Sequence, residues 1–177
     1  GQTQVGIVDE QRIGAAQTLH VAAYAGSRRV TQFLSTSVIA QSSPLSAGGV
    51  VDLLNRFAGA DARWTLATTL GDRPFTLVAG AAWDRLASQR RGYRNYTATA
   101  SGVIGELRRD EENRLYDFDQ YLQASWDVSA RWSTLLGLRH SDVHFDSADH
   151  YSTTLNPDDS GGTRYQAWTP AASLLFK

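Results

Sequence analysis

Cysteine and methionine are both absent from this sequence, and Lys177 is the only lysine among its 17 basic residues. Without cysteine the chain has no disulfide, no catalytic thiol and no thiolate ligand for a metal. Its formal net charge of −1 and its 42% hydrophobic residues indicate neither disorder nor nucleic-acid binding. A length of 177 residues suits one domain and gives no reason to expect two.

Long apolar segments are missing as well. No stretch approaches the roughly 18 consecutive apolar residues of a membrane-spanning helix, which excludes a helical membrane protein. A transmembrane β-barrel is not excluded, because its strands alternate between apolar and polar side chains and leave a weak hydropathy signal. The sequence has no initiating methionine and no basic-then-apolar leader. We therefore expect Gly1 not to be a natural start and any signal peptide to lie outside this segment.

What the sequence does contain is a period of two. Between Arg114 and Val128 the apolar side chains occupy one parity, interrupted only by Gln120, namely Tyr116, Phe118, Leu122, Ala124, Trp126 and Val128. The other parity is mostly polar. A helix would mix the two sets on one face, whereas a strand separates them. After a tight link at 129–131 the alternation resumes from Trp132, which predicts a β-hairpin.

The region from residue 63 to residue 84 repeats this plan. Trp64, Leu66, Thr68 and Leu70 alternate with more polar neighbours, and Phe75, Leu77, Ala79, Ala81 and Trp83 do the same after the turn sequence Gly71-Asp72-Arg73-Pro74. Further strands are expected near 2–9, 17–35 and 165–177. The prediction is an all-β chain, an antiparallel meander of about seven long strands.

Segment lengths favour one architecture. Strands of 12 or more residues exceed the average of about 5–6 in soluble sheets. The turns at 71–74 and 128–131 are tight, whereas the segments 37–56, 90–113 and 146–164 are long and polar. Short turns at one rim and long loops at the other are typical of an outer-membrane β-barrel. The alternative is a soluble all-β module that binds a ligand or a glycan, with its tryptophans as stacking platforms.

The aromatic residues agree with the barrel. Phe75 and Trp83 share a face eight residues apart, which is about 26 Å at roughly 3.3 Å per residue. The apolar band of outer-membrane barrels is about 25 Å tall and has aromatic girdles at both edges. Trp126 and Trp132 flank one short turn, as interfacial anchors would. We therefore expect a partial segment of a transmembrane β-barrel.

Several stretches of the sequence are also similar to those of a known family. AGGVVDLLNRFAGADARWTL, the run from GELRRDEENRLYDFDQ to FDSADHY, NPDDSGG and WTPAASLLFK resemble the barrel of TonB-dependent outer-membrane receptors, and the likeness extends over essentially the whole chain. The stretches AYAGSRRVTQFLS and RRGYRNY, with GELRRDE, FDSADHY and DDSGG, are most similar to the YncD-type branch, which is associated with uptake of pyrroloquinoline quinone.

The resemblance implies a location and a set of partners. Residues 1–177 would be a single segment from the middle of a 22-stranded barrel in the bacterial outer membrane, with no plug domain, no TonB-contacting segment and an open edge on either side. The parent would import a small scarce ligand, either pyrroloquinoline quinone-like or a ferric siderophore. Its partners would be that ligand, outer-membrane lipid and TonB, the last through the missing N-terminal part. The segment alone would not transport anything.

The second long loop supplies the candidate ligand residues. They are Arg90, Arg91, Tyr93, Arg94, Tyr96, Arg108 and Arg109. Guanidinium groups bind carboxylates in two-pronged geometry and aromatic faces stack on planar rings, so this set suits a planar polycarboxylate such as pyrroloquinoline quinone. Two other interpretations stay open. The arginines could offset Asp110, Glu111 and Glu112, or bind lipopolysaccharide phosphates at the outer surface.

Two further sets of residues are weaker candidates for a functional site. His144, Asp146, Asp149 and His150 could bind a metal, although strand pairing would point alternate members apart. Asp117 and Asp119 could serve a hydrolase, but charge in the lumen of a wide barrel normally lines water. The sequence has no nucleophile elbow, phosphate loop or HExxH motif. We therefore expect no enzymatic activity, no resident metal and no cofactor.

Overall fold

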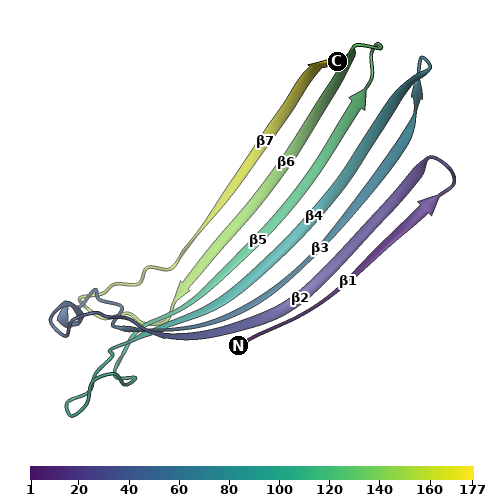
Figure 1. The fold of residues 1–177 in the computed structure, drawn as a ribbon. Helices are drawn as coiled ribbons and strands as arrows, with labels where there is room; N and C mark the ends of the chain where they lie inside the picture. Colours follow the sequence, from purple (N-terminus) through teal and green to yellow (C-terminus); the bar gives the residue numbers. More distant parts are fainter.

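Seven strands follow one another in a single curved sheet in the computed structural model, which describes residues 1–177 (Figure 1). They are β1 (Gln2–Ile13), β2 (Gln17–Phe33), β3 (Val50–Leu70), β4 (Arg73–Tyr93), β5 (Leu107–Trp126), β6 (Trp132–Asp149) and β7 (Gly161–Phe176). Each strand pairs antiparallel with its neighbours in sequence, in the order β1 to β7. The predicted meander is confirmed.

One short 3-10 helix, η1 (Ala40–Ser42), is the only helical element. None of the helical structure has the length and apolar character needed to cross a membrane. The strands contain 12 to 21 residues each, as the alternation predicts.

The connections alternate in length. Residues 14–16, 71–72 and 127–131 make short turns, and residues 34–49, 94–106 and 150–160 make long loops. Figure 1 shows the long loops gathered at one end of the sheet and the short turns at the other. The predicted loops at 37–56, 90–113 and 146–164 are too long, because paired strands continue through their charged flanks. Polarity there marks strands whose two faces both meet water.

The turn between β3 and β4 is also shorter than predicted. It contains only Gly71 and Asp72, with φ angles of 59° and 58°, and both Arg73 and Pro74 belong to β4. A two-residue hairpin turn with positive φ at both positions matches the right-handed twist of its strands. Glycine and aspartate accept this conformation more readily than bulkier residues.

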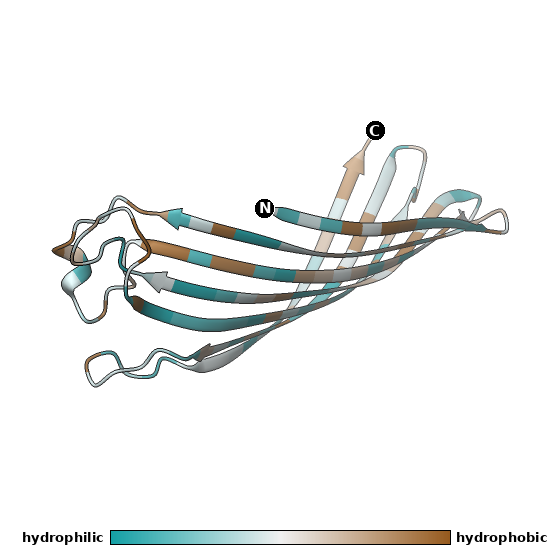
Figure 2. Cartoon of the chain, turned by 90° about the horizontal axis from the view of Figure 1, so that it is seen from below, coloured by the Kyte–Doolittle hydropathy of each residue, from teal (hydrophilic) through white to brown (hydrophobic).

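The strand register separates two faces. One row across β3 to β7 contains Trp64, Ala79, Leu122, Leu138 and Pro170. We call this side the outward face, because large apolar side chains are exposed on it over several strands, Leu122 at 52% and Leu136 at 57%. The opposite side, here the inner face, carries Arg63, Tyr121 and Arg139 in its neighbouring row. Apolar and polar colours alternate along the strands in Figure 2.

The sheet is a single layer and has almost no core. Six of its 177 residues are buried, and they are Gln41, Gly49, Val50, Gly59, Gly92 and Asp119. A soluble domain has to bury its apolar face against another layer. Nothing covers the outward face here, so the fold does not support the alternative of a soluble binding module. A lipid environment satisfies an apolar outer face of this kind.

Candidate functional site

The loop end of the sheet contains the most tightly packed part of the chain. Gln41, which is fully buried, lies against Asn95 of the loop 94–106. The Gln41 amide nitrogen donates to Asn95 Oδ1 at 2.8 Å, and the Asn95 backbone N–H donates to Gln41 Oε1 at 3.0 Å. The Asn95 amide nitrogen also donates to the Leu34 carbonyl at 3.1 Å. These bonds join the loop 34–49 to the loop 94–106.

Arg108 attaches the loop 34–49 to β5. Its guanidinium donates to the carbonyls of Ser43 and Pro44, both at 2.9 Å. The loop then passes over Gly92, where a Cβ atom would lie 2.3 Å from the Ala47 carbonyl oxygen. The position therefore admits no side chain without displacing the loop. Arg108 satisfies loop carbonyls, which leaves fewer of its donors for a ligand.

The seven candidate ligand residues do not all lie in a loop, contrary to the prediction. Arg90, Arg91 and Tyr93 end β4, Arg108 and Arg109 begin β5, and only Arg94 and Tyr96 lie in the loop between them. The cause is the longer β4–β5 ladder, which extends to the pair Tyr93–Leu107. Alternation along this ladder sends the side chains to both faces.

Arg90 and Arg91 illustrate the separation. Arg91 lies on the outward face, opposite Asp110, and its Nε is 3.2 Å from Asp110 Oδ1. Arg90 lies on the inner face and forms no ion pair. The inner face here also contains Arg28 of β2, which is exposed and unpaired. Two free cations therefore lie on the inner wall close to the long loops.

Arg94 and Tyr96 line a cleft in the loop 94–106. The cleft has a volume of about 540 Å³ and is also lined by Ile104 and Glu106. The Arg94 guanidinium is 2.8 Å from the Glu106 carboxylate, and its central carbon is 5.7 Å from the centre of the Tyr96 ring. A paired guanidinium beside an aromatic face can accept a planar anion by stacking and by its remaining donors.

Arg109 lines a second and much smaller cavity. It pairs with Glu111 at 2.9 Å on the inner face. The two line a polar cavity of about 20 Å³ together with Asp149 and Tyr151. Such a cavity holds about one water molecule, so it fixes the loops in place and does not admit an organic ligand.

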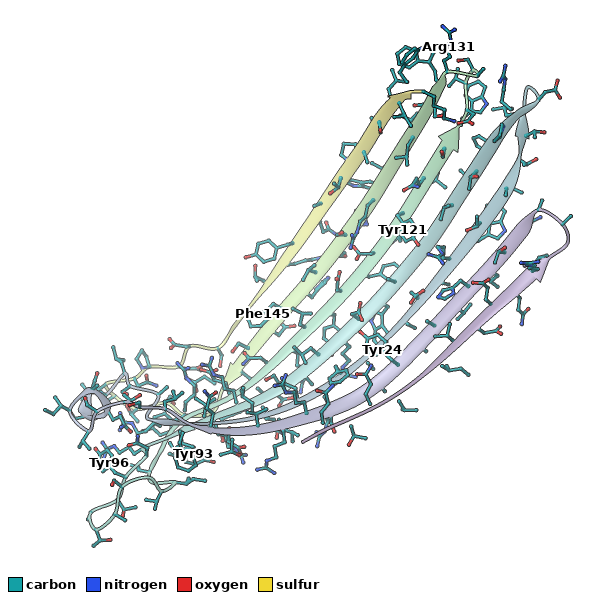
Figure 3. All side chains as sticks on the ribbon, in the orientation of Figure 1. Tyr24, Tyr93, Tyr96, Tyr121, Arg131 and Phe145 are labelled. Carbon is teal, nitrogen blue, oxygen red and sulfur yellow. The ribbon has the colours of Figure 1, made fainter.

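The inner face carries a row of polar side chains that we call the polar belt, and Figure 3 labels two of them, Tyr24 and Tyr121. Its members are Tyr24, Asp84, Asp117, Asp119 and Tyr121. The Tyr24 hydroxyl on β2 donates to Asp84 on β4. Its ring crosses Gly59 on β3, where a Cβ atom would lie 2.7 Å from ring carbons. In the same way the Tyr121 ring covers Gly80. Glycine in the middle strand thus allows each tyrosine to lie flat across the wall.

Asp117 and Asp119, the carboxylates considered for catalysis, lie on the polar belt. Asp119 is 7% exposed and accepts hydrogen bonds from Arg139 and Ser141. Asp117 lies opposite Asp84 in the neighbouring strand. Asp119 is fully hydrogen-bonded by its partners, and the carboxylate beside Asp117 is that of Asp84, which already accepts the Tyr24 hydroxyl. The arrangement is that of a polar wall lining.

Asp146 and His150 line one cleft of about 340 Å³, but the four weak metal candidates do not form a single site. His144 and Asp146 lie on the outward face, whereas Asp149 lies on the inner face. His144 is instead 3.2 Å from Asp142, and Asp149 accepts from the backbone N–H of Tyr151 at 2.9 Å. No group of three or more His, Cys, Asp or Glu side chains in the chain is placed to hold a metal ion.

Three residues of the inner face were not singled out as candidates from the sequence alone. Arg28, Tyr24 and Asp84 share the inner face with Arg63 and Asp61 once the register is known. Parity within each strand was the available signal. It gives the face of a residue but not its partner on another strand.

The geometry of the sheet and of its connections defines the class of the protein. A single-layer sheet with long strands, an apolar outward face, a polar inner face, and short turns at one rim but long loops at the other is part of the wall of an outer-membrane β-barrel. The family model "TonB dependent receptor-like, beta-barrel" matches residues 10–177. The chain belongs to this family of outer-membrane receptors.

Solved structures show the same fold. The ferric citrate transporter FecA in its unliganded form superimposes with a TM-score of 0.81 at 15% identity, over 99% of this chain and 25% of that chain. The ferric-catecholate import receptor Fiu of E. coli K12 gives TM-scores of 0.61 in its open form and 0.62 in its closed form, at 11% and 12% identity. The matches cover 98% and 99% of this chain and 32% and 29% of those chains. The chain therefore spans about a quarter to a third of the receptors it matches.

Proposed function

We propose that these residues form part of the wall and mouth of a receptor that imports a small anionic ligand with energy supplied through TonB. The observation that carries this proposal is the pair of unpaired arginines on the inner face, Arg28 and Arg90. The loop that follows β4 adds a cleft that holds Arg94 and Tyr96. Free guanidinium groups on an inner wall attract anions and bind carboxylates in two-pronged geometry. The plug and the TonB contacts belong to parts of the receptor outside this chain.

The ligand class is a small organic anion or its ferric complex. FecA is named for ferric citrate and Fiu for ferric catecholates, and chelates of this kind present oxygen-rich anionic surfaces. Pyrroloquinoline quinone, suggested by the resemblance to the YncD-type branch, is a planar polycarboxylate. Arg94 and Tyr96 suit such a planar anion better than a compact chelate, because the ring offers a stacking face.

Ligand binding to the full-length protein in detergent tests the proposal. Quenching of tryptophan fluorescence would be measured with ferric citrate, a ferric catecholate and pyrroloquinoline quinone. Replacing Arg28 and Arg90 by glutamine should weaken binding of the true ligand at least about tenfold for each lost charge-assisted contact. Arg91→Gln is the matched control, because Arg91 lies on the outward face and is already paired with Asp110.

Two results would count against the proposal. Equal affinity of the Arg28 and Arg90 variants for every bound ligand would remove the inner-face arginines from the site. An equal loss in the Arg91→Gln control would show a general effect of charge. Arg94→Gln and Tyr96→Leu then separate the planar ligand from the chelates, because only the planar ligand should lose affinity in both. Residues 1–177 alone should not transport any of these ligands.

A further inference from the structure

Along β4 and β5, the side chains of the outward face change from aromatic to basic toward the long loops. Trp83 and Phe118 lie directly opposite each other and are 40% and 43% exposed. The next rows toward the loops contain arginines. We propose that this boundary is a docking site for an outer-leaflet lipid that carries phosphate on its headgroup, with Arg56, Arg85 and Arg114 as the phosphate-binding residues.

The three arginines converge on one small area. Ala87 of β4 lies between Arg56 of β3 and Arg114 of β5 in a single row. Strands lie about 4.8 Å apart, so the Cα atoms of these two arginines are about 10 Å apart with only a methyl group between them. Arg85 is on the same face one row nearer Trp83, and its guanidinium carbon is 5.5 Å from the centre of the Tyr116 ring.

Charge distinguishes this triad from its surroundings. Arg56 and Arg85 form no ion pair, and Arg114 pairs only with Glu112 at 2.8 Å while its side chain stays 52% exposed. The other outward arginines toward the loops are neutralised by aspartates, in the pairs Arg29–Asp52, Arg91–Asp110 and Arg164–Asp142. Asp146 of β6 lies opposite Arg114, so the three arginines exceed the two neighbouring carboxylates, Glu112 and Asp146, by one positive charge. Guanidinium groups bind phosphate oxygens through parallel N–H donors.

An apolar groove lies on the same face on the side away from the loops, beyond the Trp83–Phe118 row. It is about 20 Å from the triad at roughly 3.3 Å per residue, because its lining begins six positions away along β4 and β5, at Ala79 and Gln120. Its volume is about 510 Å³, and outward side chains of β4 to β7 line it, among them Ala79, Leu122, Leu136, Leu138 and Trp168. Aliphatic walls of this kind accept an acyl chain. The order from groove to arginines is the order of an amphiphile that lies with its headgroup toward the long loops. Long loops lie on the extracellular side in these barrels, so the leaflet is the outer one.

A lipid explains both halves of the surface, whereas a free anion explains only the arginines. The inference does not depend on which ligand the receptor imports, because the triad lies on the face opposite Arg28 and Arg90. It depends on the placement of this wall in the outer membrane, which the family establishes.

Native mass spectrometry of the full-length protein, with lipid added to detergent micelles, tests the site. The probes are lipid A with two phosphates, its fully dephosphorylated form and inorganic phosphate. The test variant is Arg56→Gln with Arg85→Gln and Arg114→Gln. The control is Arg12→Gln with Arg73→Gln and Arg131→Gln, which removes the same charge near the short turns. Heat modifiability on a gel confirms that each variant is folded.

The test variant should bind phosphorylated lipid A at least about tenfold more weakly than the unmodified protein, and the control should bind it normally. Dephosphorylated lipid should bind the unmodified protein as weakly as phosphorylated lipid binds the test variant. Normal lipid binding by the folded test variant would overturn the proposal, as would equal binding of both lipids. Inorganic phosphate that binds the triad as tightly as lipid A does would also overturn it, because the groove would then contribute nothing.

Discussion

Gln41 and Asn95 are 54 positions apart in the sequence and exchange hydrogen bonds in both directions, at 2.8 Å and 3.0 Å. Asn95 begins a sequence that matches a glycosylation signal, but its amide nitrogen is engaged with the loop 34–49. The pair holds two of the three long loops together at the mouth of the wall.

Replacing Gln41 by alanine should release the loop 34–49 from the loop 94–106. The change leaves the Asn95 amide without its buried partner, and an unsatisfied buried polar group costs about 1–3 kcal/mol. Amide hydrogen exchange in both loops should accelerate, while exchange in β3 and β4 stays slow. Gln123→Ala, at an exposed strand position, is the control. Unchanged exchange in the loop 94–106 would show that the pair does not join the loops.

Gly92 should not tolerate alanine. The added methyl group would lie 2.3 Å from the Ala47 carbonyl oxygen and 3.1 Å from the Arg109 Cβ atom, and the Ala47 backbone leaves little room to relax. Overpacking of this kind costs about 1–3 kcal/mol, measured as the free energy of unfolding in urea. Gly137→Ala is the matched control, because its closest neighbour would be 3.6 Å away, and it should change stability by less than about 0.5 kcal/mol. Equal stability of the two variants would contradict the packing of the loop 34–49 against Gly92.

Asp72 should be sensitive to the shape of its replacement and not to its charge. Its φ of 58° is accessible to asparagine, whereas an ordinary L-residue such as alanine loses roughly 1–2 kcal/mol there. Asp72→Ala should therefore lower the free energy of unfolding by about that amount, and Asp72→Asn should leave it unchanged. If both variants lost the same stability, the carboxylate and not the backbone conformation would be the cause.

Asp127, in the short turn between β5 and β6, should contribute to stability in a pH-dependent way. A hydrogen bond from Ser133 and the ammonium group of Lys177 hold the pKa of Asp127 below its ordinary value. The folded pKa is lower than the unfolded one, so the contribution is complete above the unfolded pKa of about 3.9. It is lost as the pH falls through the folded pKa.

Carbon-detected NMR of the Asp127 carboxyl group measures this effect. Ser133→Ala should raise the pKa of Asp127 toward its ordinary value, because the hydroxyl donor is the largest cause of the shift. Ser125→Ala, on β5 without a bond to Asp127, is the control. An unchanged pKa of Asp127 in the Ser133 variant would assign the whole shift to Lys177.

The period of two predicted the strands and their faces because a strand exposes alternate residues to different surroundings. Tyr116, Phe118 and Leu122 lie on the outward face as predicted, and so do Phe75 and Trp83. The loop boundaries were wrong, because charged residues such as Arg90 and Glu111 were taken as loop. Beyond the membrane both faces of a strand meet water, so polarity no longer distinguishes strand from loop.

The candidate site was only partly predictable. Arg94 and Tyr96 lie together in a cleft, but Arg91 and Arg108 have their donors engaged elsewhere. The partnership of Tyr24 with Asp84 across Gly59 depends on the register of three strands. Register is a property of pairs of strands, and alternation within one strand does not contain it.

The strictly sequential order of the seven strands also governs how such a wall comes apart. Each strand pairs only with the strands before and after it in the chain, so a force that pulls out one hairpin acts first on the ladders with its immediate neighbours. Extraction should then proceed as an unzipping from the pulled hairpin, with rupture steps spaced by whole hairpins, and the far strands should remain paired until the break reaches them. A wall built in this way fails locally under load and can be reassembled by adding hairpins one at a time.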